Sequence, residues 1–560
     1  MESRIDFFAR KAKKRGGVIF ACAFFIASIA FAPCASGDDF VKSESADPAL
    51  QRTLVIVHSM ANLNLDPHTS AYVSEAQILN SVYEGLFSYN AATLEPDNAL
   101  AKDFRISRDK LRWTFTIREG AKTSSGEEIN AQMIKESWLN LIANKSAYYS
   151  SLLDVIKGAR EYRLEEGKRE EVAISASGLK LSVELIKPTS HFNKILCHHA
   201  FAAVPQDSSA SGAFYIESVT PFKLVLKKNE NYWNAEQTQL PAVEINFTDD
   251  TEAQSHSFNT GAADWIDGSG EIKKILDKKA VQLAAEFGTE YLFFKNDSPL
   301  WSRPDFRNAV LTAIPWKQLR DGNMFPAETL VCPVAGYTSP EGINYTDAEE
   351  AKMLLDAAKQ KAGITDKTVS LAFAIPDTEY LSNRAELLRG SLEEIGVELK
   401  TVKIPLQFYL TSIAKTKADL FLYTWVGDFA DPLAFLELFR GNSSMNDSGW
   451  KNDEFDSLLD QATFTNDSKE HNSLLAKAED ILLASGEVIP ISHPVTCNII
   501  DLNSVGGWIS NAMDIHPFKS IYFKKSERKL KNVVIKRAPA AKTDLGRARD
   551  LGRLGKLEFF

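Results

Sequence analysis

An apolar run that ends in a glycine and an acid is the feature that most constrains the fold. Leu420 to Trp425 are apolar or aromatic except for Thr424, a pattern typical of a strand buried on both faces of a parallel sheet. The strand breaks at Gly427, and Asp428 is the first charge after its carboxyl end. Ligands of open α/β sheets bind there, so the Asp428 carboxylate is a candidate for binding a cation. Alternatively, Asp428 caps the following helix, since Asp is a favoured N-cap.

Strand and helix patterns alternate through the second half of the chain. Helix patterns cover 348–358 and 384–395, and strand patterns cover 369–374, 397–404 and 418–423. This alternation predicts βαβ units and an α/β fold with mixed, largely parallel sheets.

Composition indicates a large globular protein. The chain has 560 residues, 44% of them apolar and 25% charged, which suits more than one domain. Its net charge of −10 argues against nucleic acid as a partner. After the N-terminal region only Cys197, Cys332 and Cys497 remain, so at most one intramolecular disulfide can form among them, and nothing local demands it.

The N-terminus has the pattern of an export signal. Six basic residues between Arg4 and Arg15 precede an apolar run from Val18 to Ala32. The run is too short to favour a permanent membrane span, and no later segment approaches the ~20 apolar residues that one needs. Cys34 is a candidate for lipid attachment, as in a lipoprotein, and cleavage after Ser36 fits about as well. We expect an exported protein, in the periplasm or on the outer face of the cytoplasmic membrane.

Metal binding and catalysis find little support in the sequence. Cys197-His198-His199 suggests metal, but adjacent histidines cannot both face one site on a helix, and no other Cys/His cluster has ligand spacing. The chain contains no Gly-x-Ser-x-Gly elbow, phosphate loop or His-Glu-x-x-His motif. We therefore expect no metal, no cofactor and no enzymatic activity.

A series of motifs in order resembles one family. Trp-x-x-Asp-Phe-x-Asp-Pro at Trp425, followed by Asn-Ser-Ser-Met-Asn, is similar to the ligand segment of bacterial oligopeptide-binding proteins, the extracytoplasmic solute-binding subunits of peptide ABC importers. Asp66-Pro67-His68 with Glu84-Gly85-Leu86, the Trp113-Thr-Phe block and Asn229-x-x-Tyr-Trp also fit the family pattern. Ser125 departs from it, where an aspartate before the glycine is usual. The resemblance runs from about residue 54 to 523.

This resemblance implies a two-lobed periplasmic-binding-protein fold of type II with an extra third domain and a hinged cleft. The expected divisions are a signal sequence (1–36), a tether (37–52), a discontinuous lobe I (53–83, 207–292 and 497–523), an additional domain II (84–206), a lobe III (293–496) and a basic tail (524–560). The tail carries twelve Lys and Arg against four acids. It is either a disordered extension or attracted to anionic lipid headgroups.

The resemblance also implies the function: a monomeric solute-binding protein for peptide transport, which captures short peptides between two lobes and delivers them to the membrane subunits of an ABC transporter. Nickel complexes, haem or glycans are alternative ligands, because relatives with this fold carry them; an enzyme is a further, weaker alternative. Asp428 is implied to pair with the peptide α-ammonium, with Phe429 beside it. Tyr148 and Trp425 are implied to contact the peptide, although each can be a core aromatic. Val73 is implied to pair with the peptide backbone from an edge strand.

Several departures put the C-terminal part of the ligand in doubt. Leu422 replaces the family arginine that can meet a tripeptide carboxylate, Ala71 replaces a glutamate, and a helix tryptophan falls near Leu406. If another cation has taken over the role of the arginine, Lys295 or Arg307 is the expected candidate.

Overall fold

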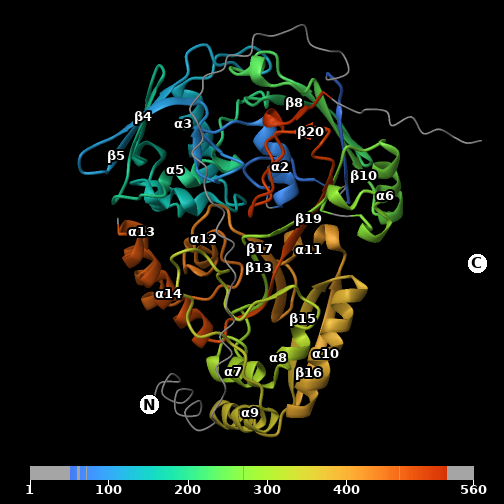
Figure 1. Ribbon diagram of the computed structural model, residues 1–560. Helices are drawn as coiled ribbons and strands as arrows, with labels where there is room; N and C mark the ends of the chain where they lie inside the picture. Colours follow the sequence, from blue (N-terminus) through green and yellow to red (C-terminus); the bar gives the residue numbers. More distant parts are fainter. Residues whose placement is uncertain (1–50, 60–62, 71, 269, 466, 526–560) are drawn as a thin grey trace, which may run out of the picture. The chain divides into compact units, whose positions relative to one another are not determined.

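The structure is a computed structural model that describes residues 51–59, 63–70, 72–268, 270–465 and 467–525. The predicted signal sequence, Cys34 and nearly all of the tether and the basic tail lie outside these residues. Three sheets of four or more strands organise the described chain (Figure 1).

The first sheet is built from distant parts of the chain. It has seven strands in the order β12-β19-β11-β1-β10-β9-β8. Their bounds are β1 (Leu54–His58), β8 (Phe214–Thr220), β9 (Lys223–Lys228), β10 (Ala242–Phe247), β11 (Trp265–Asp267), β12 (Val281–Ala285) and β19 (Val495–Ile500). Helix α2 (Val73–Val82) packs against β8, and α6 (Thr251–Thr260) packs against β11. The strands of this sheet thus come from three separate stretches of the chain.

Residues 84–206 form a separate sheet with its own helices. The strand order is β4-β5-β7-β6, with bounds β4 (Ala101–Ile106), β5 (Arg112–Ile117), β6 (Ile174–Ser177) and β7 (Lys180–Glu184). Alternate residues of β5 are buried, and Trp113 and Phe115 pack with Phe192 and Phe104. The remaining elements are β2 (Phe87–Tyr89), β3 (Pro96–Asn98), α3 (Ala131–Ala143), η2 (Ser150–Val155), α4 (Ala159–Arg163), η3 (Arg169–Glu171), α5 (Phe192–Ile195) and η4 (His199–Phe201).

The second large sheet lies in the C-terminal half. Its six strands run β14-β18-β13-β17-β15-β16, with bounds β13 (Gly288–Phe294), β14 (Phe325–Pro326), β15 (Val369–Pro376), β16 (Val397–Ile404), β17 (Leu420–Val426) and β18 (Val488–His493). Helix α10 (Glu379–Ile395) packs against β15 and β16, and α14 (Ser468–Ala484) packs against β18. Around them lie α7 (Pro304–Ala313), α8 (Trp316–Leu319), α9 (Ala348–Ala362), α11 (Tyr409–Ser412), α12 (Leu433–Leu436), η9 (Glu437–Phe439) and α13 (Asp453–Phe464) (Figure 1).

The mixed α/β fold is confirmed, but the expectation of largely parallel sheets is wrong. In the second sheet only β15 pairs in parallel, with β16 and β17, while β17 runs antiparallel to β13. In the first sheet only β1 pairs in parallel, with β10 and β11. A run of buried apolar residues reports burial on both faces and carries no information about the direction of the neighbouring strand.

One predicted domain boundary also needs correction. Strand β13 lies wholly within the second large sheet, whereas a boundary between residues 292 and 293 would cut it. The chain crosses between the two large sheets at residues 286–287 and again near Pro494, between β18 and β19.

The described residues contain no helix that is both long and apolar enough to cross a membrane. Cys197, Cys332 and Cys497 are free thiols, and the first two are buried. Within the described ranges, no group of three or more His, Cys, Asp or Glu side chains is arranged to hold a metal ion.

Candidate functional site

The backbone at Asp428 is fixed from two sides just beyond the end of β17. The Gly427 N–H donates to the Phe287 carbonyl at 2.8 Å, and the Tyr89 hydroxyl donates to the Asp428 carbonyl at 2.6 Å. A Cβ at Gly427 would lie 2.5 Å from the Phe287 ring, so only glycine allows this close approach. The turn that sequence analysis placed at Gly427 is therefore held by tertiary contacts.

The Asp428 carboxylate is buried without a full set of partners. Its side chain is 9% exposed, and among the described residues its Oδ2 atom has no hydrogen-bond partner. Burial raises the pKa of Asp428 well above its ordinary value, and the Tyr149 hydroxyl offsets only part of this rise. The helix-cap alternative is wrong, because Asp431 accepts the Leu433 N–H at the start of α12 instead. An unpaired buried carboxylate is costly unless a ligand supplies the missing partner.

The ionisable side chain that faces the Asp428 carboxylate is a neutral histidine, His198. His198 Nε2 lies 3.6 Å from Asp428 Oδ1, which is longer than a hydrogen bond. The Ala200 N–H donates to His198 Nδ1, so the ring proton is on Nε2 in the neutral tautomer. Burial lowers the pKa of His198 to about 3. His198 therefore presents a dipole and cannot neutralise Asp428. Sequence analysis singled out His198 only because it is adjacent to His199.

Asp428 lies in a cavity of about 390 Å³, called here the Asp428 pocket. Its walls are largely aromatic and aliphatic; the aromatic residues are Tyr72, Tyr89, Tyr149, Tyr409, Tyr423 and Trp425. The acids in its lining are Asp428 and Glu286, and no lysine or arginine of the described chain lines it. Such a site favours a ligand that brings its own positive charge.

Two further predicted residues line the Asp428 pocket. Trp425 is 4% exposed and donates its indole N–H to the Ala434 carbonyl at 3.0 Å, which fixes its ring at the wall. Val73 also lines the pocket, but it is the first residue of helix α2 and not part of an edge strand. The strand role expected for Val73 is therefore wrong. As a first-turn residue, it has no acceptor for its N–H within the helix.

Two other predicted residues lie outside the pocket lining. The Tyr148 hydroxyl is 3.0 Å from that of Tyr423 and donates to the Met445 carbonyl, so it supports the wall from behind. Phe429 is 1% exposed, stacks on His191 and lines a different cavity. Neither Tyr148 nor Phe429 therefore lines the pocket that contains the Asp428 carboxylate.

No cation in the described pocket lining replaces the family arginine that would meet the carboxylate of a ligand. Leu422 and Leu406 both line the Asp428 pocket as apolar surface. Arg307 is buried against the Ser485 carbonyl and Glu487, and Lys295 is occupied by backbone carbonyls and Asp297. Neither cation lines the pocket, so neither takes the place of the missing arginine.

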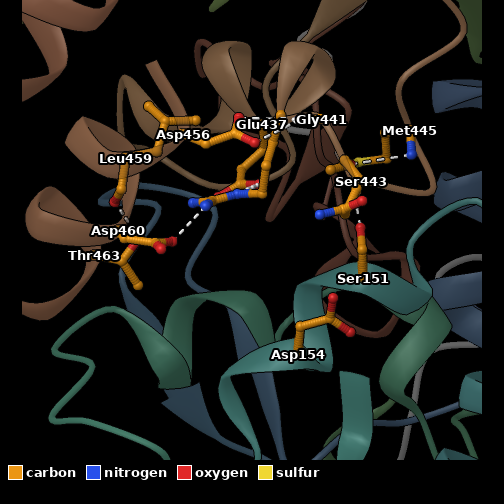
Figure 2. A network of polar contacts seen from close by, with 12 residues as sticks. Ser151, Asp154, Glu437, Gly441, Ser443, Met445, Asp456, Leu459, Asp460 and Thr463 are labelled. Carbon is orange, nitrogen blue, oxygen red and sulfur yellow. Dashed lines mark hydrogen bonds and ion pairs between the residues drawn. The ribbon is translucent and has the colours of Figure 1, made fainter. Parts of the chain in front are cut away.

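A second cavity, of about 460 Å³, lies between residues 151–195 and 429–464 and is called here the Arg440 cavity. Arg440 donates two hydrogen bonds of 2.8 Å to Glu437 and also pairs with Asp460. Asp456 accepts the Gly441 N–H. A hydrogen bond between the Ser151 and Ser443 hydroxyl groups joins the η2 segment to the loop after η9 (Figure 2). Charges in this cavity are largely satisfied by the protein itself.

Comparison with known proteins identifies relatives over nearly the whole described chain. The dipeptide-binding protein DppE of Bacillus subtilis is 25% identical over 499 residues, covering 83% of this chain and 91% of that protein. The periplasmic oligopeptide-binding protein OppA of Escherichia coli is 26% identical over 493 residues, covering 81% and 89%.

Solved structures show the same fold. The Escherichia coli murein tripeptide binding protein MppA superposes with a TM-score of 0.76 at 23% identity, covering 85% of this chain and all of that one. Haemophilus influenzae OppA in complex with RPPGFSPFR gives a TM-score of 0.75 at 18% identity, with the same coverage.

The family described as bacterial extracellular solute-binding proteins, family 5 Middle, matches residues 95–447. The match spans more than half of the chain and includes Asp428, Trp425 and His198. The chain therefore belongs to the bacterial extracellular solute-binding proteins of family 5.

Proposed function

We propose that this protein captures short peptides with a free N-terminus in the Asp428 pocket and delivers them to the membrane subunits of an ABC importer. The observation that carries the proposal is the Asp428 carboxylate, buried at the end of β17. Among the described residues, one of its oxygens has no partner and no lysine or arginine lines the pocket. A desolvated α-ammonium group is the complement of such an acid.

Other parts of the pocket suit a peptide chain. Aromatic walls provide apolar contact for varied side chains, and the first-turn N–H of Val73 offers a donor to a peptide carbonyl. The names of the relatives, dipeptide-binding and oligopeptide-binding proteins, support the same ligand class. We propose that the protein acts outside the cytoplasm, as the family description states for its members, and that it catalyses no reaction.

Calorimetry with a mixed pool of di- to pentapeptides tests the proposal. The free peptides should bind, and the same pool should lose binding when N-acetylated, because acetylation removes the positive charge that Asp428 requires. Equal binding of the acetylated pool would exclude the ammonium role of Asp428. Native mass spectrometry of protein purified without unfolding should reveal any retained peptide cargo.

A further inference from the structure

Glu286 is the second acid in the lining of the Asp428 pocket. It stands between β12 and β13, where its N–H donates to the Pro494 carbonyl at 3.0 Å. Gly288 pairs with Val426 in the antiparallel β13–β17 ladder, and the next bond joins Phe287 to Gly427. The ladder ends there, because the Phe287 N–H donates to the Ala512 carbonyl instead. The two acids, 142 positions apart in sequence, line one pocket.

The Glu286 side chain is half-buried, and within the described ranges its carboxylate forms neither a hydrogen bond nor an ion pair. Burial, together with the nearby Asp514, raises the pKa of Glu286 to about 8. The buried acid Glu479, by contrast, accepts from the Val331 N–H and the Tyr337 hydroxyl. An acid that is half-buried without such partners is available to a cation from outside.

The charge balance of the pocket leaves Glu286 without a counterion even when a peptide binds. The described pocket lining has two acids and no lysine or arginine, and His198 is neutral. One α-ammonium group can satisfy Asp428 only. The other acid is satisfied if the ligand carries a second positive charge close to the first.

We propose that Glu286 is a second cation-binding group of the Asp428 pocket and that the preferred ligands are short peptides with a Lys or Arg side chain within their first two residues. This inference rests on the proposed function, because it takes the α-ammonium at Asp428 as its starting point. The first two residues are specified because both acids line one cavity of about 390 Å³, so the second positive charge has to lie close to the α-ammonium group.

The test is calorimetry with tetrapeptides that carry either lysine or norleucine at the first or second position and alanine elsewhere. Norleucine keeps the length of the lysine side chain but lacks its ammonium group. We expect wild type to bind a lysine peptide at least tenfold more tightly than its norleucine partner at one of these positions. In Glu286→Gln this ratio should fall below twofold.

Asp447→Asn is the matched control. Asp447 is also half-buried, and burial raises its pKa to about 6, but it does not line the Asp428 pocket. This variant should keep the wild-type ratio. Melting temperatures of both variants report whether either substitution disturbs folding, and the ratio is read only from folded protein.

The outcomes separate the two proposals. If wild type binds none of the tetrapeptides, the proposed function fails and the role of Glu286 fails with it. If the norleucine peptides bind as tightly as the lysine peptides, peptide capture stands and only the role of Glu286 is overturned. A lysine preference that persists in Glu286→Gln would also overturn it.

Discussion

The Asp428 pocket and the Arg440 cavity are similar in size but opposite in how they treat charge. In the Arg440 cavity, burial by itself would lower the pKa of Arg440, but its bonds to Glu437 and Asp460 outweigh this effect and raise the pKa. In the Asp428 pocket, the Asp428 carboxylate has an unpartnered oxygen, and no cation of the described chain lines the wall. The comparison shows that a cavity alone does not identify a ligand site. In this protein, the ligand site is indicated by a buried acid, Asp428, that has an oxygen without a partner among the described residues.

The largest expected effect comes from Asp428→Asn in the pocket. The amide cannot neutralise a buried ammonium group, so peptide binding should weaken by about 3–5 kcal/mol, the scale of a broken buried ion pair. Calorimetry with one tetrapeptide gives the affinity. Unfolding of the unliganded variant should show no loss of stability. A large fall in its melting temperature would instead indicate a structural role for Asp428.

Arg440→Met should produce the opposite pattern in the other cavity. Removing the cation leaves buried Glu437 uncompensated, and we expect a loss of about 3 kcal/mol in the free energy of unfolding. Peptide affinity of the folded variant should be unchanged. Urea unfolding measures the loss. The double variant Glu437→Gln/Arg440→Met is the control and should recover much of the stability; if it does not, packing of the arginine stem and not charge pairing is responsible.

The pH dependence of unliganded stability distinguishes the two regions further. Because burial raises the Asp428 pKa, the folded state holds this proton more tightly than the unfolded chain does. This contribution to stability is therefore lost as the pH rises above the unfolded value of ~3.9.

Asp428→Asn does not titrate at this position. Its stability relative to wild type should increase with pH, by at most ~1.4 kcal/mol per pH unit. Urea unfolding at several pH values between 4 and 8 gives the difference. A wild type that gains on the variant with rising pH would show that Asp428 is ionised and paired in the empty protein.

The smallest expected effect concerns the peptide carboxylate. Leu422 lines the pocket where an arginine was expected, and neither Lys295 nor Arg307 is available there. A carboxylate facing Leu422 would lose water without gaining a partner. Amidation of a tripeptide should therefore improve its binding or leave it unchanged. A tenfold preference for the free acid, about 1.4 kcal/mol, would reveal a cation that the described pocket lining does not contain.

The sequence by itself determined the local elements and the position of the main acid. Strand β16 has the bounds predicted from its pattern, β15 extends two residues beyond its prediction, and the predicted helix at 348–358 is the first part of α9. Asp428 was found because an apolar strand, a glycine and an acid are contiguous in the chain. Residue spacing suffices for such features, because helix and strand periodicities act over a few neighbouring residues.

Only the tertiary structure decided the direction of the strands and the composition of the pocket. Periodicity does not reveal which strand lies next to which, so the sequence did not predict the antiparallel β13–β17 pairing or the presence of Glu286 in the same pocket as Asp428. His198 reaches Asp428 from a segment 230 positions away in sequence. Whether a charge is buried and whether it has a partner depends on all the segments around it. That is why the acid could be predicted from its motif, while its unpaired state could not.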